Sequence, residues 1–206
     1  MKRVLLATRN ARKLQELQRI LDGALGASAV ALVGLDDVPT YPEAPETGLT
    51  FAENALLKAR EGLRHTGLPT VADDSGLAVE ALGGMPGVFS ARWAGRHGDD
   101  RANLELLLGQ LADVPDEHRG AAFVCAAALV LPGGKEHLVD KRQAGRLIRS
   151  PRGTGGFGYD PIFVGTGQTL TNAELPAAEK DAISHRGKAF RALAKIISPA
   201  LSGAPT

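Results

Sequence analysis

The order of apolar and polar segments constrains the fold of this chain more than any other feature. Short apolar segments typical of buried strands (2–8, 29–34 and 69–72) alternate with segments in which apolar residues recur at helical spacing (11–21 and 50–67). Two strand-like segments, 119–131 and 136–149, then follow one another across Pro132-Gly133-Gly134, which predicts a hairpin. We therefore expect an α/β fold with a mixed β-sheet flanked by helices.

The remaining segments predict a single domain. A helix is expected over 99–111, a short strand over 162–164 and a closing helix over 185–197, whereas the small, polar tail 198–206 is expected to fray. With 206 residues the chain is long enough for one sizeable core or for two lobes that share a sheet. Since it contains neither an internal repeat nor an interdomain linker, one domain over 1–206 is predicted.

Composition and charge exclude several classes of protein. The longest strongly apolar run, 121–131, has 11 residues, against about 20 for a bilayer span. The N-terminal run 4–7 is also shorter than the apolar core of a signal peptide. The single cysteine, Cys125, excludes an intrachain disulfide framework, and its apolar surroundings favour a small buried hydrophobe over a nucleophile. A net charge of +1 argues against a general nucleic-acid binder. We expect a cytoplasmic protein that binds neither membrane nor nucleic acid.

Opposite charges are concentrated in two early segments. Residues 1–19 carry six Lys or Arg against one acid, and residues 36–53 carry five acids without any Lys or Arg. Such segments could converge on a metal-bound polyanion such as a nucleoside triphosphate, although the same pattern is typical of a solvated surface.

Thr8-x-Asn10-x-x-Lys13 marks the point where the first predicted strand gives way to a helix. Unpaired backbone N–H groups and the positive end of the helix dipole suit a phosphate there. Thr8 and Asn10 would add hydrogen bonds, and Lys13 a charge. The sequence is equally consistent with Asn10 as a simple helix cap and Lys13 in solvent.

Two consecutive carboxylates, Asp73 and Asp74, follow the third apolar segment. Adjacent side chains of an extended segment point to opposite faces, so at most one carboxylate is needed as a metal ligand or a base. Carboxylates without neighbouring His or Cys favour Mg²⁺. An Asx turn is the alternative interpretation of this pair.

An acidic segment leads into the second predicted helix. Thr50 and Glu53 have the spacing of a capping box, which predicts that the helix begins just after Thr50. Asn54 and Lys58 are four residues apart and share one helical face. Lys58 is therefore a candidate phosphate contact, although these residues alone favour a surface position for it.

The glycine-rich segment 153–163 holds three of the nine aromatic residues. Its glycines let the backbone approach a ligand, Phe157 or Tyr159 offers a face for a nucleobase, and Asp160 offers acceptors. A tight loop with aromatic side chains in the core is the alternative, which we favour for Tyr159 and Phe163. Further on, Lys180-x-x-x-Ser184-His185-Arg186 forms a cationic cluster, in which His185 could equally be a helix-start residue.

Taken together and in this order, these segments resemble the inosine triphosphate pyrophosphatase family. The resemblance spans residues 4 to about 197 and rests on the segments 8–13, 46–58, 72–77, 84–93 (G-M-P-G-V-F-S-A-R-W), 153–163 and 184–186. It implies an elongated mixed sheet with two lobes and a central cleft, and a homodimer. It also implies an Mg²⁺-dependent hydrolase that cleaves the α–β phosphate bond of ITP, dITP or XTP, giving the monophosphate and pyrophosphate and keeping these nucleotides out of DNA and RNA.

The resemblance also assigns roles to individual residues. Asp74 matches the general base and, with Glu46, the metal ligands; Lys13 and Lys58 match further catalytic residues. Relatives often have two consecutive acids before the Thr-Gly pair, whereas here Pro45 precedes Glu46, so position alone does not identify the acid that assists Asp74 at the metal, and Glu46 is our choice. The implied contacts with the nucleotide are Thr8, Arg9, Asn10, Ala11, Arg12, Lys13, Ser75, Phe157, Gly158, Tyr159, Asp160, Lys180, His185 and Arg186.

Two other functions are weighed against this one. A Maf-like nucleotide pyrophosphatase would have a similar architecture and a different base preference, but the segments 157–160 and 184–186 argue against it. A nucleotide sensor would keep the pocket without catalysis, and the intact Asp74 and Lys13 argue against that. A purely structural module would leave the polar clusters unexplained.

Overall fold

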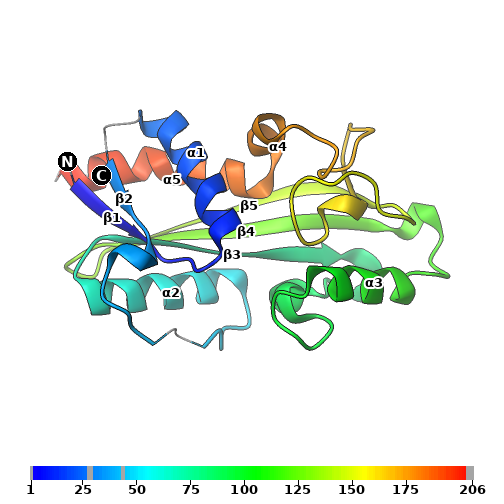
Figure 1. Ribbon diagram of the computed structural model, residues 1–206, viewed down its shortest axis with the longest axis horizontal. Coiled ribbons are helices and arrows are strands. Elements are labelled where there is room, and N and C mark those ends of the chain that lie inside the picture. The colour runs from blue at the N-terminus through cyan, green and yellow to red at the C-terminus, as the bar shows by residue number, and fades with distance from the viewer. Residues whose placement is uncertain (1, 27–29, 43–44, 203–206) are drawn as a thin grey trace. The chain divides into compact units, whose positions relative to one another are not determined.

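The computed structural model describes residues 2–26, 30–42 and 45–202, and it has an α/β fold (Figure 1). Along the chain the main elements are β1 (Lys2–Leu6), α1 (Ala11–Leu25), β2 (Val30–Val33), α2 (Phe51–Thr66), β3 (Thr70–Val79), α3 (Asp100–Gln110), β4 (Gly120–Val130), β5 (Glu136–Leu147), β6 (Phe163–Gly165), α4 (Ala177–Ile183) and α5 (His185–Ser202).

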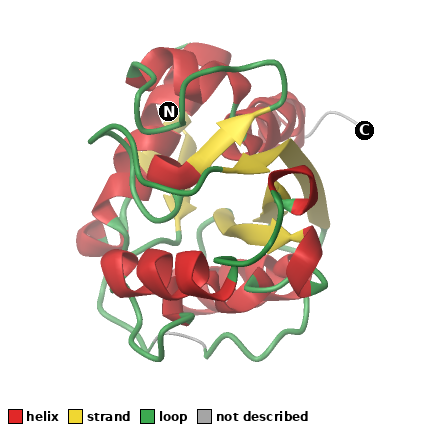
Figure 2. Cartoon of the chain, turned by 90° about the vertical axis from the view of Figure 1, so that its right-hand side faces the viewer, coloured by secondary structure: helices red, strands yellow, loops and turns green. Residues whose placement is uncertain are grey.

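The strands form one mixed sheet in the order β2-β1-β3-β4-β5-β6. Strand β1 pairs in parallel with both β2 and β3, whereas β6 is antiparallel to β5. Figure 2 shows helices on either side of the strands. The predicted mixed sheet with flanking helices and the hairpin of β4 and β5 are therefore confirmed. None of the helices in the described parts of the chain combines the length and the hydropathy of a membrane-spanning segment.

The chain divides into two compact units, and each unit consists of more than one segment of the chain. The first comprises residues 1–74, 125–141 and 186–206, and the second comprises 75–124 and 142–185. The first of the crossings between them falls within β3, between Asp74 and Ser75. The single domain over 1–206 and the cleft expected between two lobes stay predictions.

In the first unit, alternate residues of the sheet belong to two separate cores. Val4 and Leu6 of β1 pack in the cluster that holds residues of α1 and α5, and Leu5 packs in the cluster that holds Ala55 and Ala59 of α2. Helices α1 and α5 accordingly lie on one face of these strands and α2 on the other (Figure 1). Both faces of the sheet are buried here, which explains why the sequences of these strands are continuous apolar runs.

Strand β4 is buried along most of its length and carries the cysteine. Cys125 lies in the first unit's core with no exposed surface, so it is the small buried hydrophobe that the sequence predicts. Burial raises the pKa of its thiol well above the ordinary value, which argues against a nucleophilic role.

The second unit has its own core. Leu104 and Leu107 of α3 pack in a cluster with Leu77 of β3 and with the aromatic rings of Phe123 and Phe163. The latter two rings are tilted, with their centroids 4.7 Å apart, which is a favourable aromatic arrangement.

Helix α2 begins and ends where the sequence predicts. The Thr50 hydroxyl accepts a hydrogen bond from the backbone N–H of Glu53 (3.2 Å), and the Glu53 carboxylate accepts one from the backbone N–H of Thr50 (3.0 Å). At the other end Gly67 has φ of 68° and closes the helix in the left-handed conformation that glycine favours. The predicted capping box is confirmed.

Several elements differ from the prediction, and α1 for example continues past residue 21 to Leu25. The strand expected to end at Asp73 and Asp74 continues through both to Val79, because each carboxylate finds polar partners within the fold. Helix α4, which was not predicted, occupies Ala177–Ile183. Helix α5 continues to Ser202 with Pro199 inside it, so the part of the tail up to Ser202 is helical rather than frayed, and 203–206 lie outside the described residues.

We predict that Thr50→Ala destabilises the protein by about 1 kcal/mol, because the cap of α2 is lost. Thr50→Ser keeps the hydroxyl and is the matched control. Urea denaturation of both variants measures the effect. Equal unfolding midpoints for Thr50→Ala, Thr50→Ser and the unaltered protein would contradict a stabilising capping box.

Candidate active site

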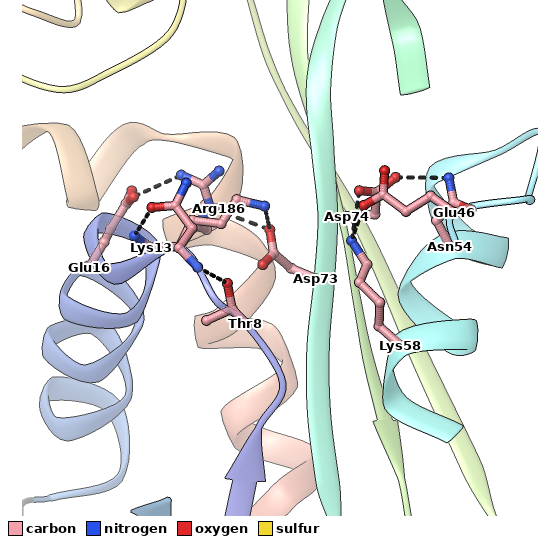
Figure 3. Close-up of polar contacts among 10 residues, drawn as sticks. Thr8, Lys13, Glu16, Glu46, Asn54, Lys58, Asp73, Asp74 and Arg186 are labelled. Carbon is pink, nitrogen blue, oxygen red and sulfur yellow. Dashed lines mark hydrogen bonds and ion pairs between the residues drawn. The ribbon is translucent and has the colours of Figure 1, made fainter. Parts of the chain in front are cut away.

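Two consecutive carboxylates of β3 point to opposite sides of the strand (Figure 3). Asp73 faces Lys13 and Arg186, and Asp74 faces Lys58 and Asn54. Both are buried, with 3% and 6% of their surface exposed. The predicted alternation is confirmed, whereas the alternative of an Asx turn is wrong because both residues lie inside a strand.

On the Asp73 side, four buried or half-buried charges alternate in sign. Lys13 Nζ lies 3.1 Å from Asp73 Oδ2, and Arg186 Nε lies 3.5 Å from the same oxygen. Arg186 Nη1 lies 2.7 Å from Glu16 Oε2. Burial alone would raise the pKa of Asp73, but the nearby Lys13 and Arg186 outweigh it and hold this pKa well below its usual range.

On the Asp74 side, one lysine is shared between two carboxylates. Lys58 Nζ lies 2.9 Å from Asp74 Oδ1 and 3.0 Å from Glu46 Oε1. Asn54 Nδ2 donates to the other oxygen of Asp74 (3.3 Å), and Asn54 Oδ1 accepts from the backbone N–H of Gly48 (2.8 Å). The position of the Asp74 carboxylate is therefore fixed by helix α2.

The two carboxyl groups of β3 differ in acidity. Burial raises the pKa of Asp74, and Glu46 adds to this, while Lys58 and Lys13 oppose it only in part. Burial lowers the pKa of Lys58, but Asp74, Asp73 and Glu46 more than compensate and raise it overall. Asp74 is thus the more basic of the two consecutive carboxylates, and Lys58 is a firmly held cation.

The Asp74 side has the donor set of a site for a hard cation. Asp74 and Glu46 both approach the Lys58 ammonium, so their oxygens converge on one positive charge. Among the described residues no group of three or more His, Cys, Asp and Glu could hold a metal. An ion bound by two carboxylates would complete its shell with water and substrate oxygens, as Mg²⁺ usually does. Asp74 and Glu46 fit such an ion.

The start of helix α1 is organised by side chains of the predicted phosphate-binding segment. Thr8 Oγ1 accepts from the backbone N–H of Asn10 (3.2 Å), and Asn10 Oδ1 accepts from the backbone N–H of Lys13 (3.2 Å). Asn10 therefore caps the helix. The Lys13 ammonium forms an ion pair with Asp73, so the alternative of a lysine in solvent is wrong. The Arg9 guanidinium donates to the backbone carbonyl of Tyr41 (3.0 Å).

Two further predicted contacts of this segment, the side chains of Ala11 and Arg12, lie outside what the structure describes.

In the second unit, the glycine-rich loop brings together several predicted nucleotide contacts. Asp160 Oδ2 accepts from the backbone N–H of Phe157 (2.9 Å) and from Lys180 Nζ (2.7 Å). The Lys180 ammonium lies 5.1 Å from the centroid of the Phe157 ring, which is within cation–π distance. The backbone N–H of Gly158 donates to Asp100 at the start of α3 (3.0 Å).

The other aromatic residues of this loop belong to the core. Tyr159 is 4% exposed and its hydroxyl donates to the backbone carbonyl of Ser90 (2.8 Å), while Phe163 is fully buried. Burial raises the pKa of Tyr159 well above its ordinary value. The prediction that Tyr159 and Phe163 lie in the core is confirmed, whereas Phe157 is half-buried.

The remaining predicted contacts are divided between the units. Ser75 is half-buried on β3, and His185 is buried with its ring stacked on Phe123 at 4.8 Å. Both belong to the second unit, as Lys180 does. Arg186 belongs to the first, where its guanidinium contacts Glu16 and Asp73.

Several buried polar residues of the structure were not predicted from the sequence. Glu16 could have been found, because it is the only acid among the six cations of residues 1–19. Asn54 was predicted to share a helical face with Lys58, but no role was assigned to it. Gln143 and Asn172 carry no motif, so only the tertiary structure shows that they hydrogen-bond to each other and that Asn172 also donates to Asp160.

The chain is similar to known proteins over most of its length. A model of the Ham1 family matches residues 4–196. A dITP/XTP pyrophosphatase of Nocardia farcinica is 65% identical over 94% of this chain and 93% of its own length.

Solved structures of similar fold also match the chain. A nucleoside-triphosphatase / dITP/XTP pyrophosphatase of Mycobacterium abscessus is 61% identical with a TM-score of 0.76, over 93% of this chain and 98% of that one. A HAM1 protein of Coxiella burnetii is 40% identical with a TM-score of 0.85, over 96% and 99%. The sequence matches span most of both proteins, and the fold agrees with them, so the chain belongs to the Ham1 family.

Proposed function

We propose that the protein hydrolyses ITP, dITP and XTP at the α–β phosphate bond to the monophosphate and pyrophosphate, keeping these nucleotides out of DNA and RNA. The observation that carries this proposal is the buried Asp74 carboxylate, whose pKa is raised and which is held beside Lys58 and Glu46. A carboxylate whose pKa is raised is a stronger base than an ordinary one, which suits a general base. The names of relatives at 60% identity and above, dITP/XTP pyrophosphatase, support the substrate class.

The first unit supplies the residues that we assign to the triphosphate. The N-terminus of α1, with Thr8 and Asn10 beside it, presents the positive end of the helix dipole, which favours phosphate oxygens. Lys13 and Lys58 offer two positive charges that are already oriented by Asp73 and Asp74. Cations fixed before the substrate binds stabilise the charge on the departing pyrophosphate.

We assign Mg²⁺ to Asp74 and Glu46. When bound, the ion supplies positive charge that polarises the phosphate oxygens and neutralises the leaving group. Glu46 is the partner of Asp74 in this assignment because its carboxylate contacts Lys58, as that of Asp74 does. Residue 45 is a proline and cannot supply a carboxylate.

In the proposed reaction Asp74 accepts a proton from a water molecule as the water oxygen attacks the α-phosphorus. The bond between this phosphorus and the bridging oxygen breaks, and pyrophosphate leaves. Asn54 and Lys58 keep the Asp74 carboxylate in place during the step. A positioned base of this type contributes about 10²–10⁴-fold to a rate.

The second unit supplies the residues that we assign to the purine. Phe157 would stack on the base, and Lys180, held by Asp160, would donate to a 6-oxo group. Adenine carries an amine at that position, so a buried donor would be left unpaired at a cost of about 1–3 kcal/mol. One such mismatch gives less than about 200-fold discrimination, so strong rejection of ATP requires a further contact. Ser75, Gly158 and His185 are the remaining candidates in this unit.

We predict that the protein with Mg²⁺ converts ITP, dITP and XTP to monophosphate and pyrophosphate, with much lower kcat/KM for ATP and GTP. Chromatographic separation of the products measures both the bond cleaved and the preference. Release of IDP and phosphate from ITP, or equal rates with ATP, would contradict the proposal.

We predict that Asp74→Asn lowers kcat for ITP by at least about 100-fold, because the base is lost, while ITP still binds. Steady-state kinetics and calorimetric titration with ITP measure the two effects. Asp113→Asn, at an exposed acid, is the matched control and should leave both unchanged. An active Asp74→Asn variant would rule out Asp74 as the base. A protein that binds ITP without any turnover, before substitution, would instead be the nucleotide sensor.

We also propose that the protein acts in the cytoplasm as a homodimer, which rests on the family resemblance. Light scattering on the purified protein should give twice the chain mass of 21.5 kDa. A mass of one chain at micromolar concentration would contradict the dimer.

A further inference from the structure

A buried pair of side-chain amides lies behind the glycine-rich loop. Gln143 of β5 is 4% exposed and Asn172 is 1% exposed. Gln143 Nε2 donates to Asn172 Oδ1 (3.0 Å), and Asn172 Nδ2 donates to Gln143 Oε1 (3.2 Å). Because each amide donates to and accepts from the other, neither can turn over without losing both hydrogen bonds.

The amide pair is connected to the carboxylate that holds Lys180. Asn172 Nδ2 also donates to Asp160 Oδ1 (3.3 Å). The opposite oxygen of Asp160 accepts from the Phe157 backbone and from Lys180. Both oxygens of this 3%-exposed residue are therefore engaged, one by the amide pair and one by the loop. The reversed orientation of Asn172 would set its carbonyl oxygen against Asp160.

We infer that Gln143 and Asn172 are positioning residues for nucleobase selectivity: through Asp160 they fix the Lys180 ammonium over the Phe157 ring. This inference rests on the proposed function, because it assigns the selectivity for a 6-oxo purine to the same loop. A lysine side chain has several rotatable bonds, so its ammonium is placed only as well as the carboxylate that it contacts. Gln143 acts one step further away, by setting which end of the Asn172 amide faces Asp160.

A role in packing alone would not require amides at these two positions. Burying a polar side chain carries a desolvation cost that its hydrogen bonds must offset, and apolar side chains of similar size would fill the same space without that cost. The amide of Asn172 adds a hydrogen bond to Asp160 that an apolar side chain could not donate. The chemistry of the pair is therefore explained by the carboxylate it contacts.

The test uses variants of similar shape in the full chain. Asn172→Leu removes the donor to Asp160, and Gln143→Met removes only the group that orients Asn172. Asn103→Leu is the matched control, because Asn103 is also 1% exposed in the second unit but bonds to the backbone of Ala91 and Ala94. Urea denaturation of all variants separates lost stability from changed selectivity.

The first measurement needs no substrate. Nuclear magnetic resonance gives the hydrogen-exchange rate of the Phe157 backbone amide, which donates to Asp160 (2.9 Å). We expect exchange about tenfold faster in Asn172→Leu and Gln143→Met than in the unaltered protein, as loss of one polar contact would give, and unchanged exchange in Asn103→Leu. Unchanged exchange in both amide-pair variants would overturn the positioning role.

The second measurement is the ratio of kcat/KM for ITP to that for ATP. We expect the ratio to fall about tenfold in both amide-pair variants, mainly through a higher KM for ITP, and to stay constant in Asn103→Leu. The double variant should match Asn172→Leu, because Gln143 acts only through Asn172. An unchanged ratio, or an equal fall in the control, would overturn the inference. If the unaltered protein itself shows no preference for ITP, the proposed function fails, and the exchange rates still decide the positioning role.

Discussion

The structure of the first unit depends on burying two consecutive carboxylates in the middle of a strand. A buried charge without a partner is strongly destabilising, and removal of one member of such an ion pair costs about 3–5 kcal/mol. Strand β3 avoids this because its pleat sends Asp73 and Asp74 to opposite sides, where helices α1 and α5 supply Lys13 and Arg186 and helix α2 supplies Lys58. The cations that stabilise the strand are those that we assign to the triphosphate.

The same arrangement gives the two acids different properties. Asp73 is surrounded by cations that outweigh its burial, so its pKa is low and it serves as a fixed negative charge. Asp74 shares its nearest cation with Glu46, and burial dominates, so its pKa is raised and it can accept a proton more readily. In the second unit the buried carboxylate of Asp160 likewise orients a cation, Lys180, and it also accepts a hydrogen bond from the backbone of Phe157.

Local signals in the sequence predict much of the fold and of the candidate site. The capping box fixes the start of α2, the alternation of a strand separates Asp73 from Asp74, and the apolar periodicity locates most elements. The errors lie where tertiary contacts override local signals. Consecutive acids resemble the end of a strand unless their cationic partners are known, and those come from distant helices. Gln143 and Asn172 are 29 residues apart, so no local pattern pairs them.

The central claim is that Asp74 directs water to the α-phosphorus of a deaminated purine triphosphate. Hydrolysis of ITP in water enriched in oxygen-18, followed by mass spectrometry of both products, tests it most directly. The account predicts one labelled oxygen in inosine monophosphate and none in pyrophosphate after a single turnover. Label in the pyrophosphate would place the attack at the β-phosphorus and contradict the account.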